Sequence, residues 1–309
     1  MAASQDSNAD HVSQAQLLSE AAEAVPTRQA SLWGDAWRRL VRNKLAVIGM
    51  VIASMLILTA VFADLIAPYG YAETVSVNLR LTKPSWNFPM GIDQNGRDVF
   101  SRVVYGARVS LLVGVAAQLI VLAIGVPVGA MAGYFGGTLD NVLMRLVDVV
   151  YAIPQLLLVL LIVNMRGPGM STIFLAIGLT GWVTMARLVR GQMLSIREQE
   201  YVKASRVSGA GPGYIILRHM LPNSMTPIIV ALTFGIPTAI FIEAALSFIG
   251  VGIRPPQPSW GQMVGTGQQY IRAVQHLMLF PSIAIALTML AFTFLGDGLR
   301  DALDVRLND

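Results

Sequence analysis

Long apolar stretches alternate with short polar segments along this chain of 309 residues. Residues 45–63 are uncharged and have about the length that a helix needs to cross a bilayer. Residues 109–139 are also uncharged, although their glycine-rich end at 133–137 is better explained as a turn. Further apolar stretches of this length follow at 142–165, 171–196, 225–250 and 277–298. The pattern predicts an all-α membrane protein with six transmembrane helices.

The composition supports a membrane protein, because 54% of the residues are hydrophobic and only 13% are charged. Soluble domains carry roughly 25% charged residues. The net charge of +4 is small and its basic residues cluster beside apolar spans, which indicates membrane topology rather than nucleic-acid binding. The absence of cysteine excludes disulfides, thiolate metal sites and cysteine nucleophiles. The three histidines are scattered and predict no metal site: His11, His219 and His276.

The first 44 residues are polar, and we expect no cleavable signal peptide there. Residues 1–30 have the composition of a disordered tail. Trp33 and Trp37 precede several basic residues, as in a segment that lies at a membrane surface. We therefore divide the chain into an N-terminal tail with an interfacial segment, 1–44, and a six-helix transmembrane domain, 45–309.

Basic residues predict the orientation of the spans. Five of them lie in the segment 28–44 and six in the loop around 187–218. Positively charged loops stay in the cytoplasm, and six crossings place both regions on that side. We therefore expect both termini to be cytoplasmic, with the loops at 64–108, 166–170 and 251–276 facing outward.

One of the cytoplasmic loops has an unusual pattern at 200–222. Its first part predicts a short helix whose one face is made mostly of small residues: Tyr201, Ala204, Ser205 and Ser208. Gly209 and the GPG at 211–213 break this helix, a second one runs from Tyr214 to Met220, and Leu221-Pro222 ends it. Two short helices joined by a bend form a knob that another protein could hold.

This segment resembles the coupling segment of ABC importer permeases, in which Glu-Ala-Ala is followed by three residues, Gly, nine residues, Ile, one residue and Leu-Pro. The spacing is intact, and the aligned positions are Lys203, Ala204, Ser205, Gly209, His219, Leu221 and Pro222. Lys203 replaces the acidic residue, although Glu200 lies one turn away, and His219 replaces the Ile. The resemblance assigns the segment 198–222, with Glu200, to contact with ATPase subunits.

An outward loop carries GIDQNGRDVFSR at 91–102. Its two glycines imitate the start of a phosphate-binding loop, but Arg97 and Asp98 stand where Lys and Ser or Thr are needed, so nucleotide binding is rejected. The same stretch resembles a segment of the C-type permease subunits of peptide and nickel importers. The matching residues are Gly91, Asp93, Gly96, Arg97, Asp98, Ser101 and Arg102. The stretches at 247–263 and 295–304 look like further signatures of this family.

The resemblance covers about residues 35–307. It implies a type I ABC importer permease fold in a bacterial inner membrane, and a subunit that is not itself an enzyme. Its partners would be a second, homologous permease subunit, two ATPases that bind ATP and Mg, and an extracytoplasmic substrate-binding protein. This chain would hold no cofactor and would form half of the path by alternating access. The implied cargo is a di- or oligopeptide, with nickel chelates, glutathione and opines as alternatives within the family.

A rival of another class is a stand-alone secondary transporter, for which inverted repeats and several buried ionisable residues would be expected. No obvious repeat is present, and Glu243 is the one acidic residue well inside a predicted span. It either lines the translocation path or is a hydrogen-bonded strut between helices.

Other residues in the predicted transmembrane spans are expected to have structural roles. Glycines at every fourth position through the second span predict close helix packing: Gly125, Gly129, Gly133 and Gly137. Arg145 and Asp148 are expected to pair at i, i+3, and Arg187 and Arg190 to end the fourth helix. Three prolines are expected to kink their helices: Pro127, Pro154 and Pro237.

Overall fold

The computed structural model of the chain describes residues 32–303, with side chains from position 34 onward. Within the described part of the chain, residues 32–38 belong to one compact unit and residues 39–303 to another. In the first unit, the early turns of helix α2 (Leu32–Arg42) hold an ion pair of 2.6 Å between Arg38 and Asp35. Trp37 on the same helix is exposed. The predicted tail at 1–30, which includes His11, and residues 304–309 lie outside the described residues.

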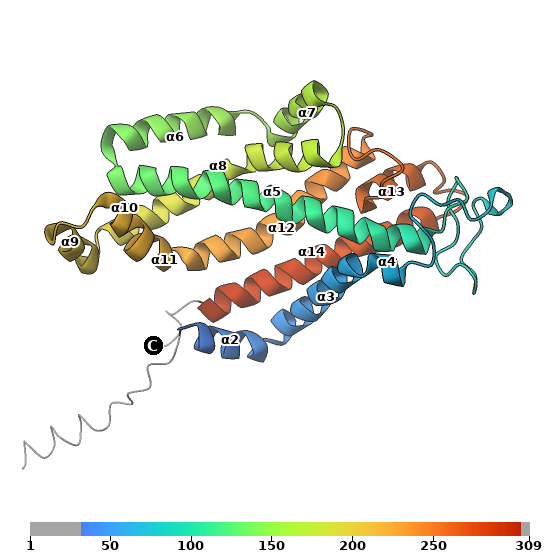
Figure 1. Ribbon diagram of the computed structural model, residues 1–309, viewed down its shortest axis with the longest axis horizontal. Coiled ribbons are helices and arrows are strands. Elements are labelled where there is room, and N and C mark those ends of the chain that lie inside the picture. Colours follow the sequence, from blue (N-terminus) through green and yellow to red (C-terminus); the bar gives the residue numbers. More distant parts are fainter. Residues whose placement is uncertain (1–31, 304–309) are drawn as a thin grey trace, which may run out of the picture. The chain divides into compact units, whose positions relative to one another are not determined.

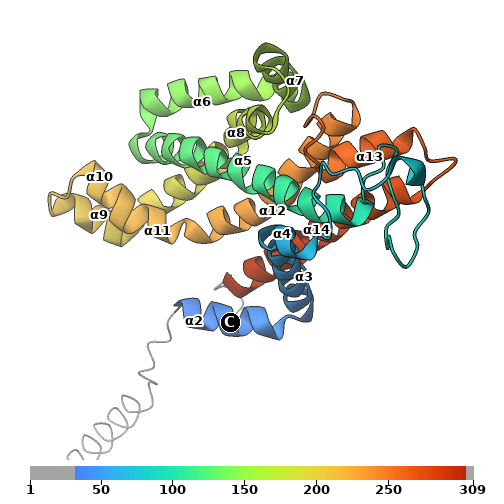
Figure 2. The same cartoon turned by 45° about the vertical axis from the view of Figure 1, so that its right-hand side comes forward.

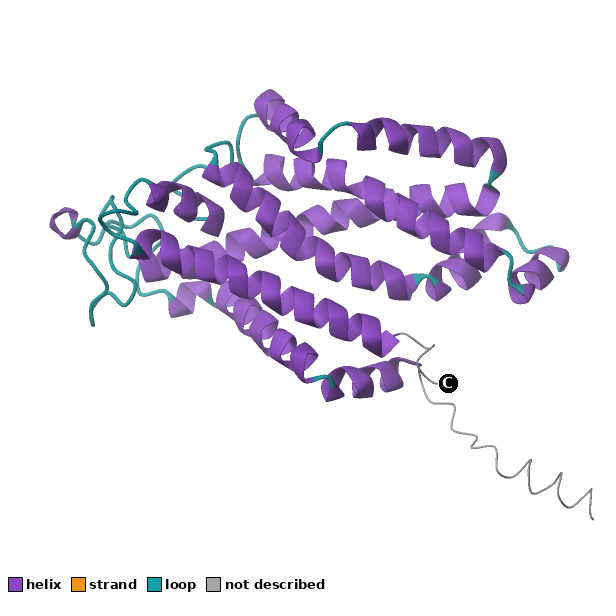
Figure 3. Cartoon of the chain, turned by 180° about the vertical axis from the view of Figure 1, so that it is seen from behind, coloured by secondary structure: helices purple, strands orange, loops and turns teal. Residues whose placement is uncertain are grey.

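In the second unit, five helices are long and apolar enough to cross a membrane. They are α3 (Lys44–Val61), α5 (Val99–Phe135), α8 (Met170–Arg197), α12 (Met225–Phe248) and α14 (His276–Leu303). A further apolar stretch forms α6 (Gly137–Ala152) and α7 (Gln155–Arg166), which are bent by 83° at a short break. Counted as one broken span, this pair brings the total among residues 32–303 to the predicted six. Between residues 32 and 303, Figure 3 shows helices and loops and no strand.

The break between α6 and α7 has a local cause. Pro154 has no amide hydrogen and its ring disfavours helical backbone at the preceding residue, so Ile153 is extended, with φ −91° and ψ 126°. The expected disruption at Pro154 is therefore confirmed as a complete break. Pro127 and Pro237, by contrast, lie inside α5 and α12, which continue past them.

Helix α5 begins ten residues earlier than the predicted span, so the outward loop ends at Asp98 rather than at 108. The Asp98 carboxylate caps the helix by accepting the Ser101 amide at 2.8 Å. Arg108 does not interrupt the helix, because its guanidinium reaches the Ala60 carbonyl and the Asp64 carboxylate, each at 2.9 Å. A span predicted from the absence of charged residues therefore leaves out the first turns of α5, which contain Arg102 and Arg108.

The predicted glycine packing is confirmed for three of the four glycines, which bring α5 against α8. A Cβ added to Gly125 would lie 2.8 Å from the Trp182 carbonyl oxygen, and one added to Gly133 would lie 2.8 Å from that of Arg190. Gly129 packs in the same way between them. Gly137 does not, because it follows Gly136 in a turn where both have positive φ, 65° and 55°.

The other long helices complete the bundle around this pair. α3 and α14 lie side by side at its lower edge in Figure 1 and remain together in Figure 2. Gly49 of α3 sits on the backbone of α14, where an added Cβ would be 2.6 Å from the Ala291 carbonyl oxygen. α12 lies between α14 and α5 and packs on both.

The shorter elements gather at the two ends of the bundle. Loops, α4 (Ala63–Ile66), a 3-10 turn (Val77–Leu79) and α13 (Trp260–Gln268) lie at the right-hand end in Figure 1, and α9 (Glu200–Val207), α10 (Pro212–Ile215) and α11 (Leu221–Asn223) at the left-hand end. α13 was not predicted, although Ser259 caps it by accepting the Gln262 amide at 3.1 Å.

Two predictions about charged residues are wrong. Asp148 pairs with Arg187 of α8 at 2.7 Å rather than with Arg145 on its own helix. Arg187 and Arg190 do not end the fourth helix, because α8 continues to Arg197. Arg190 instead binds Asp140 on α6, with two nitrogen–oxygen distances of 2.6 and 2.7 Å. The long guanidinium side chains reach across to a neighbouring helix, which spacing along one helix cannot reveal.

Candidate functional site

A cleft of about 370 Å³ opens between α5, α8, α12 and the break between α6 and α7. Most of its wall is aliphatic, and no residue that lines it is charged. Polar side chains reach it from each of these elements: Gln118 from α5, Gln155 from the start of α7, Thr184 from α8 and Thr238 from α12. None of these four polar residues was predicted from the sequence to belong to a site.

The polar groups of the cleft share one depth in the bundle. Gln118, Thr184 and Thr238 lie near the midpoints of α5, α8 and α12, and Gln155 follows the break in the α6–α7 pair. Gln155, Thr184 and Thr238 are exposed in this chain. A polar group at mid-membrane depth is costly in lipid and faces water or protein instead. The cleft is therefore a hydrated space or a contact surface rather than a lipid-facing groove.

Hydrogen bonds hold several of these side chains in place. The Gln118 side-chain amide donates to the Gly235 carbonyl at 3.0 Å, and the Gln155 amide donates to the Thr180 hydroxyl at 3.2 Å. The Thr238 hydroxyl donates to the Phe234 carbonyl at 2.8 Å. Amides and hydroxyls both donate and accept, so the cleft offers neutral polar partners on an aliphatic wall.

Glu243 does not line this cleft. It is fully buried on α12, and its Oε1 atom accepts hydrogen bonds from Ser247 and Ser259, each at 2.7 Å. Ser259 belongs to the segment that leads into α13, so the carboxylate connects a long helix to the loop end of the bundle. Of the two roles expected for Glu243, these contacts support the strut.

The predicted coupling segment forms a compact helical unit. Helix α9 ends at Val207, and Gly209 adopts a left-handed conformation with φ 82° that suits glycine. The chain becomes helical again at Pro212 rather than Tyr214, and passes through a π-helical segment (Ile216–Met220) into α11. Leu221-Pro222 therefore starts a helical turn instead of ending one, since proline is accepted in a first turn.

One side of this unit is buried and the other is exposed. Val202, Ile215 and Met220 are fully buried in a cluster with residues of α8. On the predicted face, Tyr201, Ala204 and Ser208 are exposed and Ser205 is half-buried. Apolar side chains are exposed as well, with Val207 at 89% and Leu217 at 68%. The exposed side thus has the small and apolar character of a contact surface.

The charge at Lys203 has a partner other than Glu200. Lys203 Nζ lies 3.3 Å from the carboxylate of Glu198, the residue that caps the end of α8. Hydrogen bonding from Lys203, and then from Arg197, lowers the pKa of the Glu198 carboxyl below its ordinary value. His219, at the position of the family's Ile, lies edge-on to Tyr214 with ring centroids 5.5 Å apart.

The outer-loop residues form a buried turn just before α5. The Asp93 carboxylate accepts the amides of Asn95 and Arg97, at 2.7 and 2.9 Å, and the Arg97 side chain, at 3.0 Å. Gly91 and Gly96 both have positive φ, 78° and 77°. A Cβ at Gly91 would lie 2.6 Å from the His276 ring, and one at Gly96 would approach the Ser76 carbonyl equally closely. Both positions therefore require glycine.

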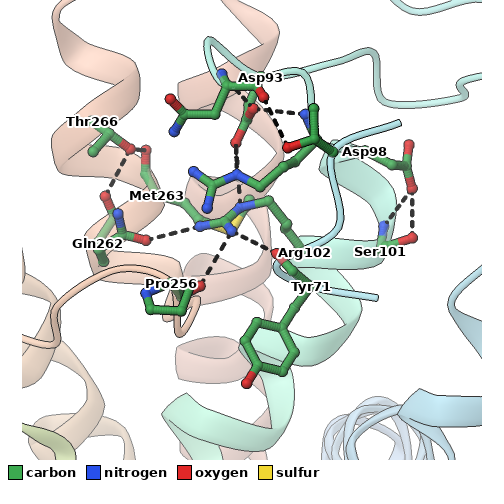
Figure 4. A network of polar contacts seen from close by, with 12 residues as sticks. Tyr71, Asp93, Asp98, Ser101, Arg102, Pro256, Gln262, Met263 and Thr266 are labelled. Carbon is green, nitrogen blue, oxygen red and sulfur yellow. Dashed lines mark hydrogen bonds and ion pairs between the residues drawn. The ribbon is translucent and has the colours of Figure 1, made fainter. Parts of the chain in front are cut away.

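Arg102 connects this turn to the second outer loop, as Figure 4 shows. Its guanidinium donates to the Tyr71 carbonyl at 2.9 Å, the Pro256 carbonyl at 3.4 Å and the Gln262 side chain at 3.2 Å, and it lies 3.6 Å from Asp93. The side chain is only 3% exposed. The residues Asp93 to Arg102 therefore hold three outer segments together.

Charges also meet at the start of α5, on its α4 side. Asp64 accepts from Arg108 and from the Tyr105 hydroxyl, each at 2.9 Å. Hydrogen bonding from Arg108, followed by that from Tyr105, lowers the pKa of the exposed Asp64 carboxyl.

Among the described residues, no group of three or more His, Asp or Glu could hold a metal ion.

Comparison with known proteins identifies the family. Residues 125–309 match the profile of the binding-protein-dependent transport system inner membrane component, and residues 31–84 match the N-terminal transmembrane domain of oligopeptide transport permease C. The chain belongs to this family of inner membrane transport components, as the resemblance implied. It is thus a permease subunit of an ABC importer, not a stand-alone secondary transporter.

Curated relatives cover nearly the whole chain. The dipeptide transport system permease protein DppC of Bacillus subtilis is 47% identical over 93% of this chain and 89% of its own length. The oligopeptide permease OppC of the same organism is 42% identical over 93% of both chains. The glutathione permease GsiD of Escherichia coli is 39% identical over 91% of this chain and 93% of its own.

A solved structure supports the fold. An inward-facing structure of the MetNI methionine ABC transporter covers 66% of this chain and 96% of its own, with a TM-score of 0.55 and 21% identity. The expected type I importer permease fold is confirmed by this likeness.

Proposed function

We propose that this chain forms half of the translocation path of a di- or oligopeptide importer, and that the cleft at the α6–α7 break is its share of that path. The observation that carries the proposal is the convergence of Gln118, Gln155, Thr184 and Thr238 at mid-membrane depth. Named relatives transport dipeptides, oligopeptides or glutathione, all of which contain amide bonds. Neutral amides and hydroxyls can exchange hydrogen bonds with such cargo without binding it too tightly to release.

The path requires a partner, because Gln155, Thr184 and Thr238 of the cleft are exposed in this chain. We propose a second, homologous but distinct permease subunit that closes it, with an extracytoplasmic binding protein delivering cargo at the end of the bundle that carries α13. The residues Asp93 to Arg102 would give that end a fixed shape. Basic residues near the other end support a cytoplasmic location for both termini and for the segment 198–222.

ATP hydrolysis belongs to other subunits in this proposal. The chain has no phosphate-binding loop, so the two ATPases that bind ATP and Mg are separate subunits. The segment 198–222 offers a surface to an ATPase, with Glu200, Lys203, Ala204 and Gly209 exposed and Ser205 half-buried. Closure of the ATPases would move this segment and shift the bundle between inward- and outward-facing states.

Reconstitution of the chain with its partner permease, ATPases and binding protein tests the proposal. Vesicles that contain ATP and Mg should accumulate a labelled di- or tetrapeptide, and vesicles without ATP should not. Uptake that persists without the ATPases and follows an ion gradient would contradict it.

The cleft is tested by Thr184→Val, which removes a hydroxyl while nearly keeping the side-chain shape. We expect a several-fold change in the peptide concentration that half-saturates uptake, with unchanged thermal stability of the complex. Thr293→Val in α14, outside the cleft, is the matched control. Equal uptake by Thr184→Val and the control would remove Thr184 from the path.

A further inference from the structure

Arg187 connects two structural features that lie far apart in the sequence. It is one helical turn beyond Thr184 on α8, and its guanidinium donates to Asp148 of α6 at 2.7 Å. The same guanidinium lies 4.1 Å from the centre of the Tyr151 ring, in a cation–π contact. Tyr151 lines the cleft beside the α6–α7 break. One α8 side chain therefore holds the end of α6 that borders the proposed path.

Arg190 repeats this arrangement one turn further along α8. Its guanidinium grips both oxygens of Asp140 near the start of α6, at 2.6 and 2.7 Å. The Asp140 side chain is only 11% exposed. A bidentate guanidinium–carboxylate pair in such a setting has a fixed geometry as well as a favourable energy. The two arginines thus attach α6 to α8 near both ends of α6.

The inner side of α6 packs on α5 and α8, and its outer side is open. Its far side is exposed, with Val142 at 60% and Val149 at 67%. Its ends are the Gly136–Gly137 turn and the break at Ile153–Pro154, both of which interrupt the helical hydrogen bonding. The inner side of α6 contributes Val147 to an apolar core with Trp182 and Val183 of α8, against which Ile124 and Val128 of α5 also pack. The arginine contacts add directional polar ties to α8. Figure 1 shows α6 running alongside α5 and α8.

The C-terminal end of α8, which is the end nearer the two arginines, leads directly into the coupling segment. Glu198 and Gln199 alone separate α8 from α9. Val202 of α9 is fully buried in one cluster with Met193 and Ile196 of α8. A displacement of α9 therefore acts on the stretch of α8 that carries the two arginines.

We propose that Arg187 and Arg190 are positioning residues that make α6 follow α8, so that movement of the segment 198–222 reshapes the wall of the cleft from Tyr151 to Gln155. The α6 helix is the lever and the break at Pro154 is its flexible end. This inference rests on the proposed function, because it takes the cleft as the path and 198–222 as the ATPase contact.

The experiment uses the complete complex of this chain, its partner permease, ATPases and binding protein, and measures peptide uptake and ATP hydrolysis in the same vesicles. Arg190→Gln and Asp140→Asn should each lower the number of peptides imported per ATP by about tenfold, while ATP hydrolysis persists. The reversed pair Asp140→Arg with Arg190→Asp should recover part of the loss. Asp64→Asn, which breaks an ion pair at the other end of the bundle, should leave the ratio unchanged.

A covalent replacement of the ion pair separates positioning from simple stability. The chain contains no cysteine, so in a complex whose other subunits have had their cysteines replaced, Asp140→Cys with Arg190→Cys can be joined selectively by a short bifunctional thiol reagent. The unjoined double variant should be uncoupled, and joining should restore coupling because α6 again follows α8. Loss of uptake on joining would show that α6 must slide along α8, and normal coupling in the unjoined variant would show that the pair transmits nothing. Either result overturns the inference.

The two proposals fail differently. If the unmodified complex imports no peptide, the proposed function is wrong. If it imports peptide and the tether results are contrary, only the lever is wrong.

Discussion

The backbone of Arg190 in α8 lies directly against Gly129 of α5, where an added Cβ would stand 3.0 Å from the Arg190 amide nitrogen. The α5–α8 pair that supports the cleft therefore depends on the absence of a side chain at this point.

Gly129→Ala should destabilise the helix pair, because the new methyl group meets backbone atoms that cannot turn aside. Overpacking of this kind costs about 1–3 kcal/mol, and we expect a lower midpoint of thermal unfolding for the purified complex. Gly191→Ala is the matched control, since nothing lies within 4 Å of its added Cβ. In a helix interior that change should stabilise by up to about 1 kcal/mol. Equal midpoints for both variants would contradict the packing argument.

Gly209→Ala tests the bend of the coupling segment. The added Cβ has open space around it, but the left-handed backbone at φ 82° disfavours any L side chain by about 1–2 kcal/mol. We expect weaker co-purification of the ATPases and fewer peptides imported per ATP, and a larger loss for Gly209→Val. Gly211→Ala has the same open space at an ordinary φ of −70° and should behave as the unmodified chain. A loss of similar size in Gly211→Ala would mean that the surface, not the bend, is responsible.

Two substitutions of Glu243 separate a strut from a charge in the path. Glu243→Gln keeps an oxygen that can accept from Ser247 and Ser259, so uptake and thermal stability should change little. Glu243→Ala leaves two buried hydroxyls without their acceptor, at a cost of about 1–3 kcal/mol, and should lower the unfolding midpoint. Equal loss of uptake in both variants, with unchanged stability, would assign Glu243 to the path instead.

Arg102→Lys keeps the charge but loses the forked donor. The ammonium cannot reach Tyr71, Pro256 and Gln262 together, and each buried acceptor left unsatisfied costs about 1–3 kcal/mol. The outer loops should become more sensitive to limited proteolysis, with weaker binding of the substrate-binding protein. Arg80→Lys, at an exposed position in the same loop, should leave the cleavage pattern unchanged.

Lys203→Glu introduces the acidic residue that the family has at this position. It should nevertheless weaken ATPase binding in this chain, because it places a second negative charge beside Glu198. The double change with Glu198→Lys should recover ATPase binding. The lowered pKa of Glu198 means that its attraction for Lys203 is present above the ordinary carboxyl pKa and is lost as pH falls through the lower folded value. Acidification should therefore weaken ATPase binding of the unmodified chain only below the pH at which an ordinary glutamate carboxyl is protonated. Glu198→Gln should remove that pH-dependent step.

The number of spans and the family could be predicted from the sequence, because bilayer length and three separated motifs are properties of consecutive residues. The start of α5 could not be found in this way, since Arg102 and Arg108 are compensated by groups on distant segments. Asp148 pairs with Arg187 rather than with Arg145 for the same reason, because Arg187 lies on α8, 39 positions away in the sequence.

The cleft could have been suspected from Gln118, Thr184 and Thr238, which are polar residues near the centres of apolar stretches. Their convergence depends on how α5, α8 and α12 pack, and no spacing along the chain reports that. The charge of Glu243 in an apolar stretch indicated a possible place in the path. In the structure its carboxylate is buried and hydrogen-bonded to Ser247 and Ser259 instead.

The break at Pro154 also affects the thickness of the apolar layer beside α6 and α7. With a rise of about 1.5 Å per residue, α6 and α7 are roughly 24 and 18 Å long, and neither matches a hydrocarbon layer of about 30 Å. Where the helices part, the layer can be bridged by water, by thinned lipid or by a neighbouring protein surface. If water occupies the break, a polar solute there crosses a shorter dehydrated distance than in the surrounding bilayer. Part of the barrier to its passage is then lowered independently of ATP hydrolysis.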